Sequence, residues 1–236
     1  MVDFNVSDFK MLEVAPRVQP DTRAITELVM NGVKAQENVY GPVFTVKVID
    51  YALRLISSQI GEEKPEDIKT LDQLTEYLLS KEGKFPPYWV VLWAQFKTEK
   101  KFEGYRGAGT RLMDMGISKR VIDSNGDLRS DLIKIDVENV LSKLRQTTIE
   151  MKVAPLQMGY KENEDGSIDV LHRDCYFLDA CQLALNEGLL KRADGRMVCG
   201  VFALVCQYLK KAAGCEWDYT IHVFDKPNCV ARCFII

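Results

Sequence analysis

Residues 199–236, CGVFALVCQYLKKAAGCEWDYTIHVFDKPNCVARCFII, decide the fold class that the sequence predicts. Up to Gly214 the apolar side chains recur at helical spacing and the polar ones gather near the end, which predicts a helix with a buried start. Two runs rich in β-branched and aromatic residues follow, at 217–224 and 230–236, and the DKPNC segment between them suits a turn. This order predicts a helix that leads into an antiparallel hairpin.

A second hairpin is predicted upstream of that helix. Asp165-Gly166, a pair typical of tight hairpin turns, lies between short apolar runs at 158–160 and 168–171. Helices are predicted before and after this hairpin, the second with Asp174 as its N-cap. Four short strands in two hairpins, covered by helices on one face, indicate an α+β fold with an antiparallel four-stranded sheet.

The N-terminal half is predicted to be helical. Asp21 and Thr70 each precede a run with helical periodicity as N-cap residues, and Thr70 begins the pattern of a capping box. The segment YWVVLWAQFKTEKKF is predicted to be another helix, with a strand as the alternative for its apolar part. We therefore predict a single domain over residues 1–236, with a helical part at 1–130 and an α+β part at 131–236.

Composition limits the classes of function. The 236 residues are 47% hydrophobic and 28% charged with a net charge of −3, which is globular composition without the basic surface of a nucleic-acid-binding protein. The longest apolar run, YWVVLWA, is far too short to span a membrane. The N-terminal MVDFNVSDFK lacks the apolar core of a signal peptide, so we expect a cytoplasmic location with neither nucleic acid nor membrane as partner.

All seven cysteines and both histidines lie within residues 172–233. An odd number of cysteines in a chain that we expect in the cytoplasm does not indicate a disulfide framework. The ordinary interpretation is that each cysteine is a small buried core residue. Their clustering with histidine and aspartate favours a metal site over that interpretation.

Zinc is the metal that this set of residue types predicts, because zinc takes thiolate, imidazole and carboxylate ligands, usually four in all. The predicted ligands come from the start of the helix and from both sides of the final turn: Cys199, His222, Asp225 and Cys233, with Cys229 as the alternative to Asp225. In a regular strand His222 and Asp225 point to opposite faces, so the prediction requires the strand to end or bulge near Phe224.

A second candidate site is formed by His172 and Cys175, which lie three residues apart at a predicted strand-to-helix junction. In an enzyme, Cys175 would be the nucleophile and His172 the nearby base. The alternative interpretation is a partly buried structural pair, because local spacing alone does not define a site.

The stretch from Cys175 to Ile236 resembles the 4-vinyl-reductase domain family, which is related to sensor domains of aromatic-responsive regulators and to subunits of a Golgi transport particle. Cys199 opens the helix, Gly214 closes it, and the ligand positions of that family fall on His222, Asp225 and Cys233. The sequence departs from the family pattern, which has an acid at the first of these three positions and a cysteine at the second. The resemblance implies a structural zinc site, an apolar cavity beneath the sheet and a homodimer.

The function that we predict is a cytoplasmic, dimeric domain that binds a small apolar or aromatic molecule and carries a structural metal site. The pocket is predicted to be lined by Trp89, Trp93, Phe96 and Cys206, although buried aromatic residues more often form ordinary core. The alternatives are a metal-dependent or cysteine-dependent enzyme, a hydrolase or reductase, and a scaffold or interaction subunit.

Overall fold

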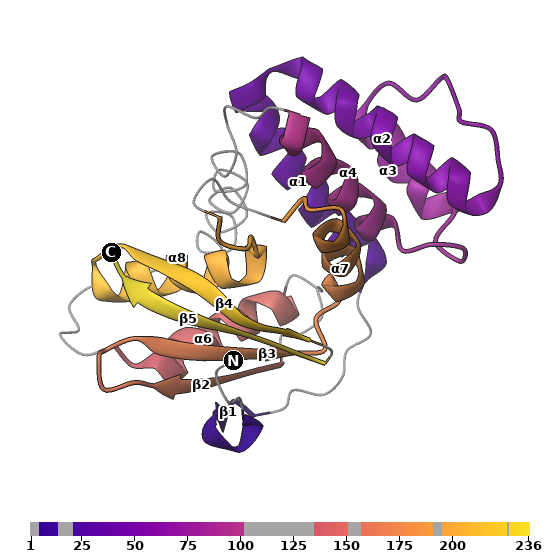
Figure 1. The fold of residues 1–236 in the computed structure, drawn as a ribbon. Coiled ribbons are helices and arrows are strands. Elements are labelled where there is room, and N and C mark those ends of the chain that lie inside the picture. Colours follow the sequence, from indigo (N-terminus) through magenta and orange to yellow (C-terminus); the bar gives the residue numbers. More distant parts are fainter. Residues whose placement is uncertain (1–4, 14–20, 102–134, 151–156, 191–194, 226) are drawn as a thin grey trace. The chain divides into compact units, whose positions relative to one another are not determined.

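The computed structural model describes residues 5–13, 21–101, 135–150, 157–190, 195–225 and 227–236 (Figure 1). By its internal contacts the chain divides into two compact units. Unit 1 comprises residues 1–19, 118–178 and 199–236, and unit 2 comprises residues 20–117 and 179–198. Unit 1 therefore contains the predicted α+β segment together with the N-terminus, and unit 2 contains the predicted helical segment together with a short piece of the C-terminal half.

Unit 1 contains an antiparallel sheet in the order β1-β2-β3-β5-β4. The strands are β1 Lys10–Met11, β2 Gln157–Glu162, β3 Ile168–Arg173, β4 Trp217–Asp225 and β5 Asn228–Ile235, and a 3-10 helix, η1 (Val6–Asp8), precedes β1. The predicted α+β class and both hairpins are confirmed, but the sheet has five strands rather than four. The sequence missed β1, because a strand of two residues has no alternating pattern to detect.

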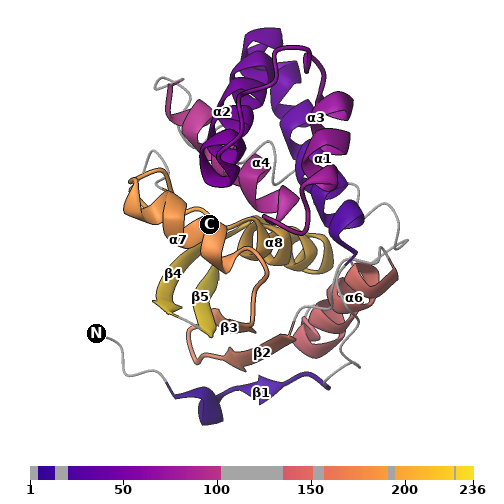
Figure 2. The ribbon, with the colours of Figure 1, turned by 90° about the vertical axis from the view of Figure 1, so that its right-hand side faces the viewer.

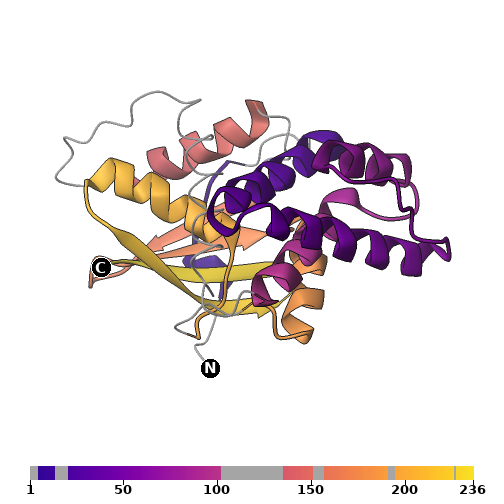
Figure 3. The ribbon, with the colours of Figure 1, turned by 90° about the horizontal axis from the view of Figure 1, so that it is seen from above.

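Helices α6 (Val137–Glu150) and α8 (Gly200–Ala213) lie on the same face of this sheet, as Figure 3 shows. α8 packs against β4 and β5, and α6 packs against α8 and β2. Phe202 and Tyr208 of α8 are fully buried, and the Tyr208 hydroxyl lies 3.2 Å from Oγ1 of Thr147 on α6. Burial of such a side chain contributes about 1.5–3 kcal/mol, so α8 and its N-terminus are held firmly on the sheet.

The helix after β3 begins later than the sequence predicts. α7 spans Leu178–Asn186, so the prediction of Asp174 as its N-cap is wrong. Asp174 has a left-handed backbone with φ of 53°, and its N–H donates to the carbonyl oxygen of Pro227 at 2.9 Å. Aspartate tolerates this conformation better than most residues do. A hydrogen bond to the turn before β5 therefore replaces the expected helix start.

Unit 2 contains the helices α1 (Thr22–Tyr40), α2 (Pro42–Ile60), α3 (Leu71–Ser80), α4 (Pro87–Lys101) and nearly all of α7 (Figure 2). α4 includes the apolar segment for which a strand was the alternative, so the helix prediction is confirmed. The N-cap predictions are also confirmed: Asp21 accepts a hydrogen bond from the N–H of Ala24 at 3.1 Å, and Thr70 forms its capping box. No helix in the described part of the chain is long and apolar enough to cross a membrane.

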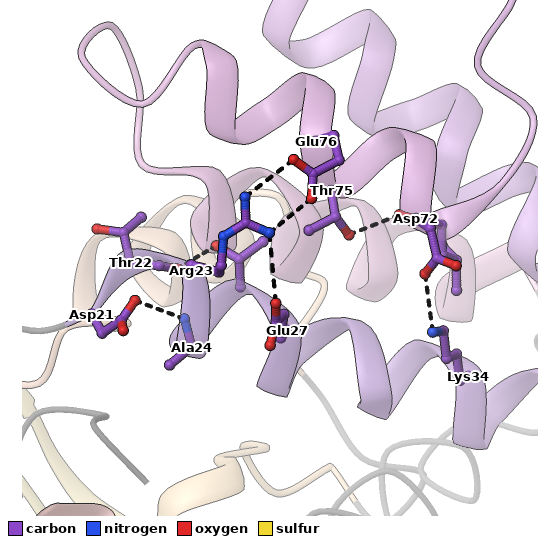
Figure 4. A network of polar contacts seen from close by, with 11 residues as sticks. Asp21, Thr22, Arg23, Ala24, Glu27, Lys34, Asp72, Thr75 and Glu76 are labelled. Carbon is purple, nitrogen blue, oxygen red and sulfur yellow. Dashed lines mark hydrogen bonds and ion pairs between the residues drawn. The ribbon is translucent and has the colours of Figure 1, made fainter.

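Polar contacts join α1 to α3 on the surface of unit 2 (Figure 4). Nη1 and Nη2 of Arg23 donate to the two carboxylate oxygens of Glu76 at 2.7 and 3.1 Å. Further along α1, Nζ of Lys34 lies 3.2 Å from Oδ1 of Asp72. These side chains are exposed, so the pairs contribute little to stability and mainly fix the orientation of α3 on α1.

Candidate functional site

His172 and Cys229 form the centre of the candidate site, because they are direct cross-strand partners on β3 and β5. Partners in an antiparallel pair project from the same face, with their Cβ atoms about 4.5–5.5 Å apart. Both residues are buried, with exposed fractions of 2% and 5%. Their face of the sheet is the one that α8 covers, because Tyr219, on the same face, contacts Phe202 of α8 with ring centroids 6.1 Å apart.

Cys175 is brought to this pair by the backbone of Asp174. The hydrogen bond from Asp174 N–H to Pro227 joins the end of β3 to the turn that precedes β5. Cys175 therefore leaves the sheet beside the start of β5, where Cys229 lies, and the charge of Cys229 contributes to raising the pKa of Cys175.

Cys199 enters the site from α8, where it occupies the N-cap position with an extended backbone. Its own N–H donates to the hydroxyl of Tyr219 at 2.8 Å, which ties the start of the helix to β4. Oxygen-bearing side chains are preferred at an N-cap, so a cysteine in this position sacrifices some helix stability. The backbone N–H groups of Phe202 and Val201 act on the thiol and oppose the effect of its burial.

The electrostatics of the three thiols and the imidazole have one dominant cause, which is burial. Burial raises the pKa of Cys175 to about 12 and that of Cys229 to about 11. Burial, followed by the charges of Cys175 and Cys229, also raises the pKa of Cys199. Burial lowers the pKa of His172 to about 4. All four groups are therefore neutral at pH 7 unless a cation compensates their charge.

Three sulfur donors and one imidazole nitrogen form a common set of zinc ligands. The four residues come from three segments of unit 1, namely the end of β3, the start of β5 and the N-terminus of α8. Across the described residues, no group of three or more His, Cys, Asp or Glu side chains is placed so that it could hold a metal ion. The set therefore matches zinc in the chemical types of its donors and not in their present geometry.

The ligands predicted from sequence do not all meet. The register of β4 shifts between Ile221 and Val223, so His222 is an extra, bulged residue and lines a cavity together with Asp169 and Arg232. Asp225 pairs with Asn228, next to the position of Cys229. Because adjacent strand residues alternate in direction, His222 and Asp225 lie on the face opposite to the cysteines of β5. The bulge lies between Ile221 and Val223 rather than near Phe224, and it places His222 on the face opposite to the cysteines of β5.

Cys233 also lies apart from Cys229, although both project from the same face of β5. They are four positions apart, which is about 13 Å along a strand, whereas zinc–sulfur bonds are about 2.3 Å long. Cys233 is fully buried and pairs with Ile168 and Tyr219. One zinc ion cannot bind both Cys229 and Cys233 in this fold.

The residues predicted to line an apolar pocket belong to different units. Trp93 and Phe96 are buried in unit 2, where Trp93 Nε1 donates to Oε1 of Glu187 at 2.9 Å. Trp89, also in unit 2, is half-buried and contacts Phe85 with ring centroids 4.5 Å apart. Cys206 is buried in α8 of unit 1. The three aromatic residues have the contacts of ordinary core.

Sequence reasoning found all four residues of the cluster but divided them between two hypotheses. His172 and Cys175 appeared as a local pair, and Cys199 and Cys229 as part of a C-terminal metal site. The missing information was the pairing of β3 with β5, which connects two hairpins and leaves no local pattern. Only an assignment of the strand pairing would have shown that His172 and Cys229 oppose each other.

Comparison with protein-family models, with curated proteins and with solved structures finds no match, so the resemblance to the 4-vinyl-reductase family stays a prediction.

Proposed function

We propose that unit 1 is a metal-binding domain that holds one zinc ion with Cys175, Cys199, Cys229 and His172. The observation that carries the proposal is the state of His172. The residue is 2% exposed and directly opposes Cys229, and burial lowers the pKa of its imidazole to about 4. A neutral imidazole beside a cysteine is a pair of ligand types that zinc takes in proteins.

The role that fits this position is structural. The four residues would join the end of β3, the start of β5 and the N-terminus of α8, which are far apart in the sequence. A divalent ion, when bound, supplies the positive charge that favours thiolates over thiols at these three cysteines, of which Cys175 and Cys199 are half-buried. Structural zinc sites contribute folding free energy directly, so the ion would stabilise the arrangement of the two hairpins.

Cysteine-dependent catalysis by Cys175 and His172 is less well supported. A nucleophilic cysteine needs a lowered pKa and a charged or basic neighbour. Burial has the opposite effect here, because it raises the pKa of Cys175 to about 12 and lowers that of His172 to about 4. Thiolate and imidazolium are therefore both disfavoured at neutral pH.

The predicted homodimer remains a proposal, and an exposed apolar patch in unit 2 supports it. Val39 at the end of α1 and Val43 and Val46 at the start of α2 have exposed fractions of 43%, 59% and 60%. A specific interface buries roughly 1,600 Å² in total, so this patch would be one part of it. Sedimentation that gives only the 26.9 kDa monomer at micromolar concentration would count against the dimer.

The metal proposal is tested by the zinc content of the purified protein, measured by elemental mass spectrometry. We expect one zinc per chain in the wild type and loss of zinc in Cys199→Ser and Cys229→Ser. Cys215→Ser is the matched control, because Cys215 follows α8 and lies outside the cluster. Cys233→Ser distinguishes the two ligand sets: retention of zinc supports the set proposed here, whereas loss of zinc supports the set predicted from sequence.

A further inference from the structure

The opposite face of the sheet in unit 1 contains a cavity of about 150 Å³. Its apolar lining comes from Phe9, Val223 and Val230, and its polar lining includes Lys161, His222 and Arg232. This volume is small for a ligand pocket, because such pockets run from roughly 300 Å³ upward. The cavity therefore suits a compact molecule with one apolar and one polar end.

The N-terminal segment forms one wall of the cavity. β1 pairs with β2, and the preceding residues Asn5, Asp8 and Phe9 line the cavity. Oδ2 of Asp8 lies 3.8 Å from Nζ of Lys161 on β2, which links this wall to the sheet. The opposite wall contains His222, whose position in the bulge of β4 directs it to this face.

The lining of the cavity contains two cations, Lys161 and Arg232, and two carboxylates, Asp8 and Asp169. Both carboxylate oxygens of Asp169 are occupied, because they accept from Nε and Nη2 of Arg232 at 2.8 and 3.0 Å. Although burial acts to raise the pKa of Asp169, the hydrogen bonds from Arg232 and Asn163 leave it lowered, so the pair stays ionised. Nη1 of Arg232 makes no hydrogen bond to the described residues, and the Lys161 ammonium, 3.8 Å from Asp8, and the His222 ring line the cavity with it.

We infer that this cavity binds a small organic acid, with the carboxylate against Arg232, His222 and Lys161 and the apolar body against Val223 and Val230. A carboxylate accepts charge-assisted hydrogen bonds from guanidinium and ammonium groups, which are about twice as strong as neutral ones. The apolar part would cover the valine side chains and displace water from them. This inference does not depend on the metal site, which lies on the other face.

The probe for this site is benzoate, a small acid with an aromatic body, and its neutral control is benzamide. Titration of the ¹⁵N-labelled full chain is followed by NMR up to millimolar concentrations, where weak binding is still measurable. We expect saturable shifts at Val223, Val230 and Phe9, and binding of benzamide weaker by about tenfold because it lacks the charge. Equal binding of the two probes, shifts elsewhere, or no saturable binding would overturn the inference.

Variants locate the carboxylate. The double variant Asp169→Asn/Arg232→Gln removes the guanidinium without leaving an unpaired carboxylate, and it should abolish the preference for benzoate. Arg23→Gln/Glu76→Gln is the matched control, because it removes a bidentate pair from the surface of unit 2. Lys161→Gln, at an exposed position, gives an independent test and should weaken benzoate binding severalfold. Unchanged preference in both cavity variants would refute the assignment.

Discussion

Replacing Gly159 with alanine tests how β1 is held on the sheet. Gly159 pairs with Met11, and a Cβ atom on it would lie 2.6 Å from Sδ of Met11 and 3.3 Å from the carbonyl oxygen of Lys10. The Met11 side chain is flexible and can move aside. The Lys10 carbonyl is backbone, so β1 itself must shift by a few tenths of an ångström to accommodate the new methyl group.

The size of the effect is limited by what β1 contributes. Overpacking of a well-packed contact costs about 1–3 kcal/mol. Complete release of β1 would expose Leu12, now 6% exposed, and break the bond from Leu12 N–H to the Met158 carbonyl at 3.0 Å, a loss of about 2–4 kcal/mol. We therefore expect Gly159→Ala to lower the free energy of unfolding by about 1–3 kcal/mol.

Urea unfolding measures this change, and hydrogen exchange at the Leu12 amide, which bonds to the Met158 carbonyl, reports whether β1 loosens. Gly83→Ala is the matched control, because no atom lies within 4 Å of a Cβ placed there. The control should be neutral or stabilising by up to about 1 kcal/mol. The reasoning is refuted if Gly159→Ala keeps wild-type stability and wild-type protection of the Leu12 amide.

Two further predictions concern the proposed metal site. In metal-free protein, acid should destabilise unit 1 below about pH 6.5, because the pKa of His172 is lowered to about 4 in the folded state and the unfolded chain therefore binds the proton first. The decrease in the free energy of unfolding approaches about 3 kcal/mol near pH 4. Urea unfolding between these pH values should show a free energy of unfolding that falls less steeply with pH for His172→Gln than for the wild type. The pKa values of Cys175 and Cys229 are raised, to about 12 and about 11, so the unfolded chain loses these protons first as the pH rises. Stability of the metal-free fold should therefore also fall on the alkaline side, above about pH 9. A strong chelator should lower the melting temperature of the wild type and leave that of Cys199→Ser unchanged, so equal shifts in both proteins would contradict the site.

Features that depend on neighbouring residues were predictable from the sequence. The capping box at Thr70 and the turn at Asp165-Gly166 each involve groups a few residues apart, so their signal is local. Asp174 shows the limit of this approach. Its sequence context is that of an N-cap, yet a hydrogen bond to Pro227, distant in the chain, decides its conformation.

The candidate site was predictable in composition but not in geometry. Residue types alone suggested soft metal ligands near the C-terminus, and Cys199 and Cys229 are members of the cluster. Their partners depend on which strands pair, because His172 opposes Cys229 only through the register of β3 with β5. A strand changes the face of every side chain when its register shifts by one residue, so periodicity could not assign His222 to a face.

Deletion of His222 should separate the two proposed sites, because it removes the bulged residue without changing any pairing. Ile221 pairs with Ala231 and Val223 pairs with Val230, so joining Ile221 directly to Val223 leaves a regular antiparallel ladder. Every later residue of β4 keeps its partner and its face, including the position opposite Cys229. Zinc content should therefore stay at the wild-type value, while benzoate binding should weaken because one wall of the cavity is lost. Loss of zinc from the deletion variant would show that the bulge itself positions the thiol cluster and that the two faces of the sheet are not independent.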